Sequence, residues 1–249
     1  VLADFFSFRM VYLLLAATML VGVVTTLLAR EPQVAAGSPK TLREAVVQPF
    51  VDFFTRPGAL LILAFILFYK IGDSMAQAMT TPFYLDMGFS TSEIGAVAKL
   101  FGFWATILGG LLGGVLILRL GISRSLWMFG ILQGGSTAAF VVLVWVGNDL
   151  AWLAAVIAFE NLASGMGTAA YVAFMGSLTN KRFTATQYAL LSSLMGVPRV
   201  LAAAPTGYLA EQTGWAMFFV ICSLMALPGL LLLQRFAPWR SLQPAQASA

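Results

Sequence analysis

The chain contains no histidine and only one cysteine, Cys222. Without histidine it has no Ser-His-Asp triad, no zincin-type metal site and no histidine ligand for haem. A single cysteine forms neither an internal disulfide nor a cysteine-based metal cluster. The sequence therefore gives no support for an enzyme, and we expect neither a metal nor a cofactor.

Charge is scarce as well. Charged residues make up 10% of the chain and hydrophobic residues 60%, with a mean hydropathy of +0.89, whereas soluble domains carry about a quarter charged residues. A chain this apolar needs a lipid bilayer as its solvent. The net charge of +4 does not indicate a nucleic-acid partner, because the basic residues lie singly or in pairs between apolar runs.

Seven apolar runs are long enough to cross a bilayer, which takes roughly 17–25 residues. They cover residues 10–29, 60–83, 94–118, 126–146, 150–178, 188–209 and 215–233. The sequence therefore predicts an all-α integral membrane helical bundle that contacts membrane lipid. Val1 leads into the first run without an initiator Met or a basic segment, so we expect the chain to be cut from a longer protein.

Basic residues in the connections between runs gather on one side. One set of connections holds Arg30, Lys40, Arg43, Arg56, Arg119, Arg124, Lys181, Arg182, Arg235 and Arg240. The other set holds Arg9, and otherwise the acidic residues Asp4, Asp86, Asp149 and Glu211. By the positive-inside rule, the first set faces the cytoplasm, and the first run crosses from outside to inside.

Two local patterns recur about 93 residues apart. Residues 89–93 and 183–187 each place a hydroxyl residue three positions before Glu or Gln, which is typical of a capping box at a helix start. Residues 114–121 and 207–214 each end a run with glycines. The copies lie three runs apart, which reverses their direction through the membrane and predicts inverted repeats, as in secondary transporters. Chance similarity of two common turn patterns is the alternative.

These patterns predict a domain organisation. Residues 1–29 are the last transmembrane helix of an N-terminal bundle, and residues 30–58 are a polar, proline-containing cytoplasmic linker. Residues 59–235 form a six-helix C-terminal bundle of two inverted repeats, 59–147 and 148–235, and residues 236–249 form a cytoplasmic tail.

The segment with Gly114, Arg119, Gly121 and Arg124 resembles the loop signature Gly-x-x-x-Asp-Arg-x-Gly of the major facilitator superfamily. The resemblance implies that these residues form a gating loop. Leu118 stands where the signature has its acidic residue, which weakens the charge network of such a loop.

A closer resemblance covers residues 60–233. It is carried by residues 69–73, 98–99, 129–134, 159–170 and 186–192, of which Glu160-Asn161-Leu and Gly165-Met-Gly-Thr-Ala-Ala are the most specific. These resemble the C-terminal half of AmpG-type muropeptide permeases. The resemblance implies import of anhydromuropeptides across the bacterial inner membrane for cell-wall recycling, which feeds β-lactamase induction. It also implies a missing N-terminal bundle as partner; a related permease, such as one for acetyl-coenzyme A, is the alternative.

Five ionisable residues lie inside the apolar runs: Lys70, Asp73, Lys99, Glu160 and Arg199. A charge at the bilayer centre costs about 2.5–3.5 kcal/mol on insertion scales, so such residues are candidates for function. Lys70 and Asp73 are three residues apart on one helix face and are expected to pair. The pair either only eases its own burial or takes part in substrate binding or gating.

Glu160 and Arg199 lie near the middle of adjacent runs, where we expect them to pair across the bundle. Arg199 would bind a substrate carboxylate, and Glu160 would carry a proton, so that the proton gradient drives transport; a structural ion pair is the alternative. Lys99 lies about 10 Å inside its run. It either attracts an anionic group from outside or extends to the outer interface.

Three amides, Gln133, Asn161 and Gln187, are candidates for hydrogen bonds to sugar hydroxyls or peptide amides. A complete seven-helix receptor or retinal pump is a competing interpretation. It is disfavoured because a retinal protein needs a lysine in its last helix, and residues 215–233 contain none.

Overall fold

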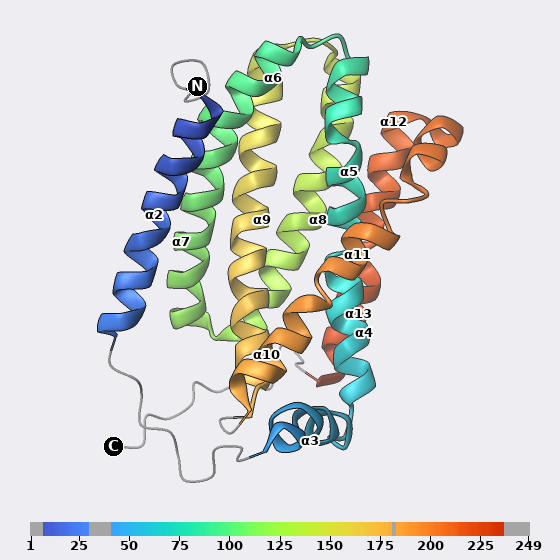
Figure 1. Ribbon diagram of the computed structural model, residues 1–249. Coiled ribbons are helices and arrows are strands. Elements are labelled where there is room, and N and C mark those ends of the chain that lie inside the picture. Colours follow the sequence, from blue (N-terminus) through green and yellow to red (C-terminus); the bar gives the residue numbers. More distant parts are fainter. Residues whose placement is uncertain (1–6, 30–40, 181–182, 237–249) are drawn as a thin grey trace. The chain divides into compact units, whose positions relative to one another are not determined.

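The computed structural model describes residues 7–29, 41–180 and 183–236, in which every regular element is a helix (Figure 1). The chain separates into two units, Val1–Ser38 and Pro39–Ala249. The first unit contains α2 (Phe8–Leu28). The second contains α3 (Leu42–Phe54), α4 (Ala59–Tyr69), α5 (Ile71–Asp86), α6 (Thr91–Val97), the π-helix η1 (Ala98–Gly102), α7 (Phe103–Leu120), α8 (Ile122–Val146), α9 (Leu150–Leu178), α10 (Thr184–Ser193), α11 (Gly196–Leu201), α12 (Thr206–Leu224) and α13 (Ala226–Phe236).

The predicted all-α membrane bundle is confirmed. Six helical stretches of the described chain are long and apolar enough to cross a membrane: Phe8–Leu28, Ala59–Asp86, Thr91–Leu120, Ile122–Val146, Leu150–Leu178 and Thr206–Arg235. Each coincides with a predicted run. The basic residues Arg30, Lys40, Lys181, Arg182 and Arg240, Asp4, and residues 237–249 of the predicted tail lie outside the described part, so the orientation and the domain division stay predictions.

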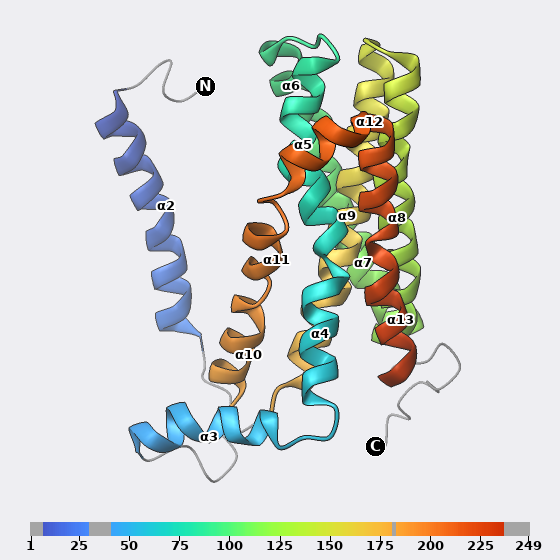
Figure 2. The ribbon, with the colours of Figure 1, turned by 90° about the vertical axis from the view of Figure 1, so that its right-hand side faces the viewer.

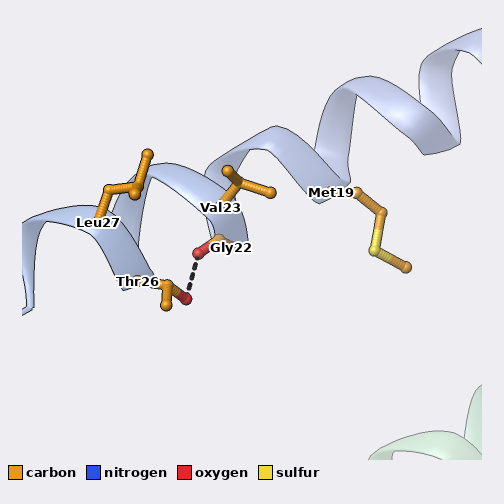
Figure 3. Close-up of a pocket in the computed structure, with 5 residues that line it drawn as sticks. All are labelled: Met19, Gly22, Val23, Thr26 and Leu27. Atoms are coloured by element: carbon orange, nitrogen blue, oxygen red, sulfur yellow. Dashed lines mark hydrogen bonds between the residues drawn. The ribbon is translucent and has the colours of Figure 1, made fainter.

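Three threonines of helix α2 satisfy their hydroxyl groups within the helix, as polar groups in lipid must be satisfied. The hydroxyls of Thr18, Thr25 and Thr26 donate to backbone carbonyls three or four residues earlier. Figure 3 shows the Thr26 hydroxyl turned toward the carbonyl oxygen of Gly22, at 2.8 Å, within a shallow apolar hollow on this helix. The threonines are therefore compatible with a lipid-facing helix.

The predicted run 60–83 is interrupted at Lys70, which separates α4 from α5. Lys70 has φ −107° and ψ 4°, outside the helical region. A carbonyl group freed near the break finds a new partner, because the hydroxyl of Tyr171 donates to the carbonyl oxygen of Ile66. The ring of Tyr171 stacks on that of Tyr69, whose hydroxyl donates to the carbonyl oxygen of Leu126 at 2.9 Å. Tertiary contacts thus stabilise the break.

The prediction that residues 188–209 form one continuous span is wrong. This segment forms α10 and α11, and α12 begins within it at Thr206. The cause is two prolines. Pro198 cannot donate a hydrogen bond to Leu194, where the helix breaks, and Pro205 cannot donate one to Leu201, where α11 ends.

The two copies of the second predicted repeat pattern have similar backbone geometry at their last glycine, while the inverted repeat itself stays a prediction. Gly121 has φ 80° and ψ 162°, and Gly214 has φ 73° and ψ 163°. Only glycine adopts this conformation readily, so each copy turns the chain in the same way. Adding the spacing of 93 residues to η1, Ala98–Gly102, gives residues 191–195, which contain the break between α10 and α11. Both copies therefore have an irregular backbone at the corresponding place.

The first repeat pattern is confirmed in one copy only. The Ser90 hydroxyl accepts from the backbone N–H of Glu93 and the Glu93 carboxylate accepts from the backbone N–H of Ser90, which is a complete capping box. In the other copy, α10 has Phe183 as its N-cap residue without a side-chain hydrogen bond. The predicted capping box at Thr184 and Gln187 is wrong, because the Gln187 side chain bonds elsewhere.

Helix α9 packs against α7 on one side and α8 on the other (Figure 1). Glycines allow the close approach of α7 to α9: a Cβ on Gly109 would overlap the carbonyl oxygen of Leu162, and one on Gly113 would lie 2.9 Å from Cα of Met166. Small residues at helix contacts are typical of membrane bundles.

We expect Gly109→Ala to destabilise the protein by about 1–3 kcal/mol, as overpacking of a close contact does. The neighbouring Gly110 is the matched control, because no atom lies within 4 Å of a Cβ built there. Thermal unfolding of both variants in detergent measures the difference. Equal melting temperatures would contradict the packing described for α7 and α9.

Candidate functional site

Four of the predicted site residues come together where α4, α5, α8 and α9 meet. Lys70, Asp73, Gln133 and Glu160 are only 8%, 9%, 5% and 5% exposed, and we call them the buried polar cluster. Lys70 Nζ lies 3.1 Å from Asp73 Oδ2 and 3.3 Å from Gln133 Oε1. The predicted pairing of Lys70 with Asp73 is confirmed.

Glu160 approaches the cluster from α9. The hydroxyl of Ser136 lies 2.6 Å from Glu160 Oε2 and 2.9 Å from the carbonyl oxygen of Gln133, and its single O–H has these two acceptors within reach. The carboxyl group of Glu160 interacts electrostatically with both Asp73 and Lys70. Gly167 gives the amide of Gln133 its space, because a Cβ there would lie 2.7 Å from Gln133 Oε1. Two carboxyl groups thus share one ammonium group inside the bundle.

Arg199 lies apart from Glu160, and the predicted ion pair between them is wrong for the described structure. Glu160 bonds to Ser136 of α8, whereas Arg199 is exposed and lines a cavity of about 280 Å³ with Ser74, Gln77 and Ala78. The reason is that α11 packs against α5 and α4 (Figure 2). We call this space the Arg199 cavity.

Asn161 and Lys99 lie near the π-helix η1 rather than in the buried polar cluster. Asn161 Oδ1 accepts from the hydroxyl of Thr106 at 3.0 Å, and its Nδ2 donates to the carbonyl oxygen of Ile157 at 2.8 Å. A Cβ on Gly102, the last residue of η1, would lie 3.3 Å from Asn161 Nδ2. Lys99 is exposed within η1. Asn161 therefore joins α9 to the first turns of α7, next to the π-helix that carries Lys99.

Gln187, predicted to bind substrate, instead joins α10 to α3, which lies across one end of the bundle (Figure 2). It is completely buried. Its Nε2 donates to Asp52 Oδ2 at 2.7 Å and to the carbonyl oxygen of Pro49 at 3.1 Å, and its Oε1 accepts from the backbone N–H of Asn180 at 2.7 Å. These bonds engage both the oxygen and the nitrogen of the amide, and a role in substrate binding stays a prediction.

Arg56 completes this contact. It forms an ion pair with Asp52 and donates to the carbonyl oxygen of Leu178, the last residue of α9, at 2.5 Å. Desolvation acts to raise the pKa of Asp52, but hydrogen bonds from Gln187, Arg56 and Asn180 outweigh it and hold the pKa below the ordinary value. The network of Asp52, Arg56, Gln187 and Asn180 thus holds α3 to the ends of α9 and α10.

We expect this network to weaken in acid. Because the pKa of Asp52 is lower in the folded state, its stabilisation is fully present above the ordinary value of 3.8 and is lost as the pH falls through the folded pKa. Amide hydrogen exchange of α3 at pH 7 and at about pH 3 measures the loss, as the protection of α3 relative to an unfolded chain at the same pH. In Asp52→Asn, exchange at pH 7 should already be faster and should respond less to acid; the same acid response in both proteins would contradict the assignment.

The predicted gating-loop residues lie where α7 turns into α8. Gly121 makes the turn with its positive φ, and Arg119 is exposed in the last turn of α7. Arg124 is half-buried, and its Nε has no hydrogen-bond partner among the described residues. A Cβ on Gly114 would meet no atom within 4 Å. Their role in gating stays a prediction.

Sequence inspection missed three residues at the site: Ser74, Gln77 and Ser136. A signal existed for two of them. Gln77 follows Asp73 by four residues and Ser136 follows Gln133 by three, the spacings at which side chains on a helix meet. Ser74 becomes a candidate only through the packing of α11 on α5.

Comparison with known proteins gives a family and several relatives. The family model described as Major Facilitator Superfamily matches residues 70–248. The anhydromuropeptide permease of Escherichia coli K12 is 46% identical over 223 residues, which are 89% of this chain and 45% of the relative. A putative transporter AmpG 4 of Rickettsia felis is 39% identical, over 76% of this chain and 46% of the relative.

An uncharacterised protein of Haemophilus influenzae is 39% identical, over 95% of this chain and 59% of its own length. The chain thus spans about half the length of the curated relatives it matches. The names of these relatives point to a transporter and not to an enzyme, which agrees with the function expected from the sequence.

Proposed function

The chain belongs to the major facilitator superfamily, and from this premise we propose that it forms the C-terminal half of a proton-coupled importer of anhydromuropeptides. The cargo is inferred from the relative in Escherichia coli, whose name states that substrate. We further propose that the protein lies in the bacterial inner membrane, with its linker and C-terminus in the cytoplasm, as the distribution of basic residues indicates. An N-terminal bundle would complete the carrier, because such sites lie between two halves.

The observation that carries the proposal is the buried polar cluster next to the Arg199 cavity. Lys70, Asp73 and Glu160 together have a net charge of −1 when all are ionised, and Lys70 already pairs with Asp73. An uncompensated charge inside a membrane protein is costly. A proton on Glu160 removes it, and Oε1 of Glu160 has no hydrogen-bond partner among the described residues. Glu160 is therefore the proposed proton carrier.

Arg199 is the proposed binding group for a carboxylate of the cargo. It is exposed to a polar cavity, and guanidinium groups bind carboxylates with two parallel hydrogen bonds. The proposed importer therefore has its anion-binding group and its proton carrier on different helices, α11 and α9.

Uptake of labelled anhydromuropeptide by vesicles that contain the full-length protein tests the proposal. We expect uptake that depends on a proton gradient and falls at least about tenfold in Arg199→Ala, since a charged hydrogen bond contributes about 1.5–3 kcal/mol. Unlabelled acetyl-coenzyme A is the competitor that tests the other cargo: it should not reduce uptake. No uptake in wild type, or full uptake in Arg199→Ala, would contradict the function or the site, respectively.

A further inference from the structure

Gln77 of α5 touches both parts of the site. Its side chain is exposed and lines the Arg199 cavity together with Ser74 and Arg199. At the same time its Nε2 donates to Oδ1 of the buried Asp73, at 3.1 Å. A single side chain therefore connects the space open to a solute with the buried polar cluster.

Each of the two carboxylate oxygens of Asp73 accepts one hydrogen bond. Oδ1 accepts from Gln77 and Oδ2 accepts from Lys70, and Lys70 is itself shared with Gln133. On its other side, Asp73 interacts electrostatically with Glu160. A change at Gln77 therefore alters the environment of both carboxyl groups.

A glutamine amide has two N–H donors. In the described structure, one hydrogen bond goes to Asp73. Gln77 is exposed and lines a cavity that Arg199 also lines, so its second N–H can serve an anionic group bound there. One amide would then hold two anions, Asp73 and the cargo, at a short fixed separation.

Building on the proposed function, we propose that Gln77 is the positioning residue that couples binding of a carboxylate in the Arg199 cavity to binding of a proton by the Asp73–Glu160 pair. The bound carboxylate adds negative charge next to two carboxyl groups that share one ammonium group. Repulsion then favours uptake of a proton from the outer solution, which forms an O–H bond on one carboxyl oxygen. When the cargo leaves, this O–H bond breaks and the proton passes to water on the inner side of the membrane.

Coupling of this kind is reciprocal. If the cargo promotes proton binding, protons must promote cargo binding by the same factor. The cargo should therefore bind more tightly at low pH, and this dependence should require Gln77. Without the amide bridge, the cargo can still bind Arg199, but it is no longer held near Asp73.

Other titratable and charged groups also face the carboxyl pair. They are Lys70 between α4 and α5, Tyr69 of α4 and Tyr84 of α5. Helix α8 contributes the uncharged Gln133 and Ser136, and α12 brings Cys222 against Gly72. Arg199 of α11 lies in the neighbouring cavity. All of these are retained when Gln77 alone is replaced, so the substitution isolates the bridge.

The test is the affinity of the full-length protein for labelled anhydromuropeptide at pH 8 and pH 5.5. In wild type we expect the dissociation constant to fall on the order of tenfold at the lower pH, within the range typical of coupled sites. In Gln77→Met, which keeps the size but removes the amide, the change should be less than about twofold. Gln77→Asn, one methylene too short to bridge, should behave like Gln77→Met.

Ser74→Ala is the matched control. Ser74 lines the same cavity from the same helix, and none of the described contacts joins it to Asp73. The Ser74→Ala variant should keep the wild-type pH dependence of cargo binding even if its affinity changes. Wild-type pH dependence in both Gln77 variants would overturn this inference alone. Affinity that does not depend on pH in wild type would overturn the proton coupling as well.

Discussion

In Glu160→Gln we expect the full-length protein to exchange cargo across the membrane but not to accumulate it. Glutamine has nearly the shape of a protonated glutamate, and its carbonyl oxygen can still accept the hydrogen bond from Ser136. The bundle should therefore fold as before. The side chain can no longer take up or release a proton, so the carrier cannot draw on the proton gradient.

Two assays on the same vesicles separate these effects. Exchange of internal unlabelled for external labelled anhydromuropeptide should stay within about twofold of wild type, because it needs no net proton movement. Under an imposed proton gradient, the ratio of internal to external cargo concentration should not rise above about one. The free energy of the gradient no longer acts on the cargo, so nothing shifts its distribution.

Glu211→Gln is the control for the loss of an acidic residue. Glu211 is exposed in α12 and is separate from the buried polar cluster. The Glu211→Gln variant should accumulate cargo as wild type does. Accumulation by Glu160→Gln equal to that of wild type would show that another group carries the proton and would remove Glu160 from the mechanism.

Hydropathy was sufficient to predict six of the seven expected spans, because crossing a bilayer imposes a length that can be counted. The run 150–178 forms α9 with the predicted bounds. Pairing of Lys70 with Asp73 was predictable too, because it depends on a three-residue spacing along one chain segment. Both predictions depend on local sequence alone.

Contacts between distant segments were not predictable in this way. Gln187 was expected near a substrate, but it bonds to Asp52, 135 residues earlier. Arg199 was expected to reach Glu160, but the break between α10 and α11 leaves it facing Gln77. The break itself has a sequence signal in Pro198; the consequence for Arg199 depends on which neighbour α11 packs against.

The pair of Lys70 and Asp73 offers the largest expected effect on stability. Asp73→Asn removes the carboxylate that forms the ion pair with the buried Lys70 ammonium group, and breaking such a pair from one side typically costs about 3–5 kcal/mol. Lys70→Met leaves Asp73 and Glu160 as two carboxyl groups without their shared ammonium group, with a comparable cost. Unfolding of each variant in detergent measures these losses, with Lys99→Met as the control, because Lys99 is exposed.

The double variant, Lys70→Met with Asp73→Asn, decides whether this pair serves only its own burial. Removing both charges should recover most of the stability lost in either single variant, because an uncharged pair needs no mutual compensation. If the pair also holds Gln77 and Glu160 in their coupled arrangement, proton-driven accumulation should stay lost although the fold is restored. If the double variant recovers both its stability and its accumulation of cargo, the pair has only a structural role. If the stability lost in the double variant equals the sum of the losses in the two single variants, the two residues do not form an ion pair.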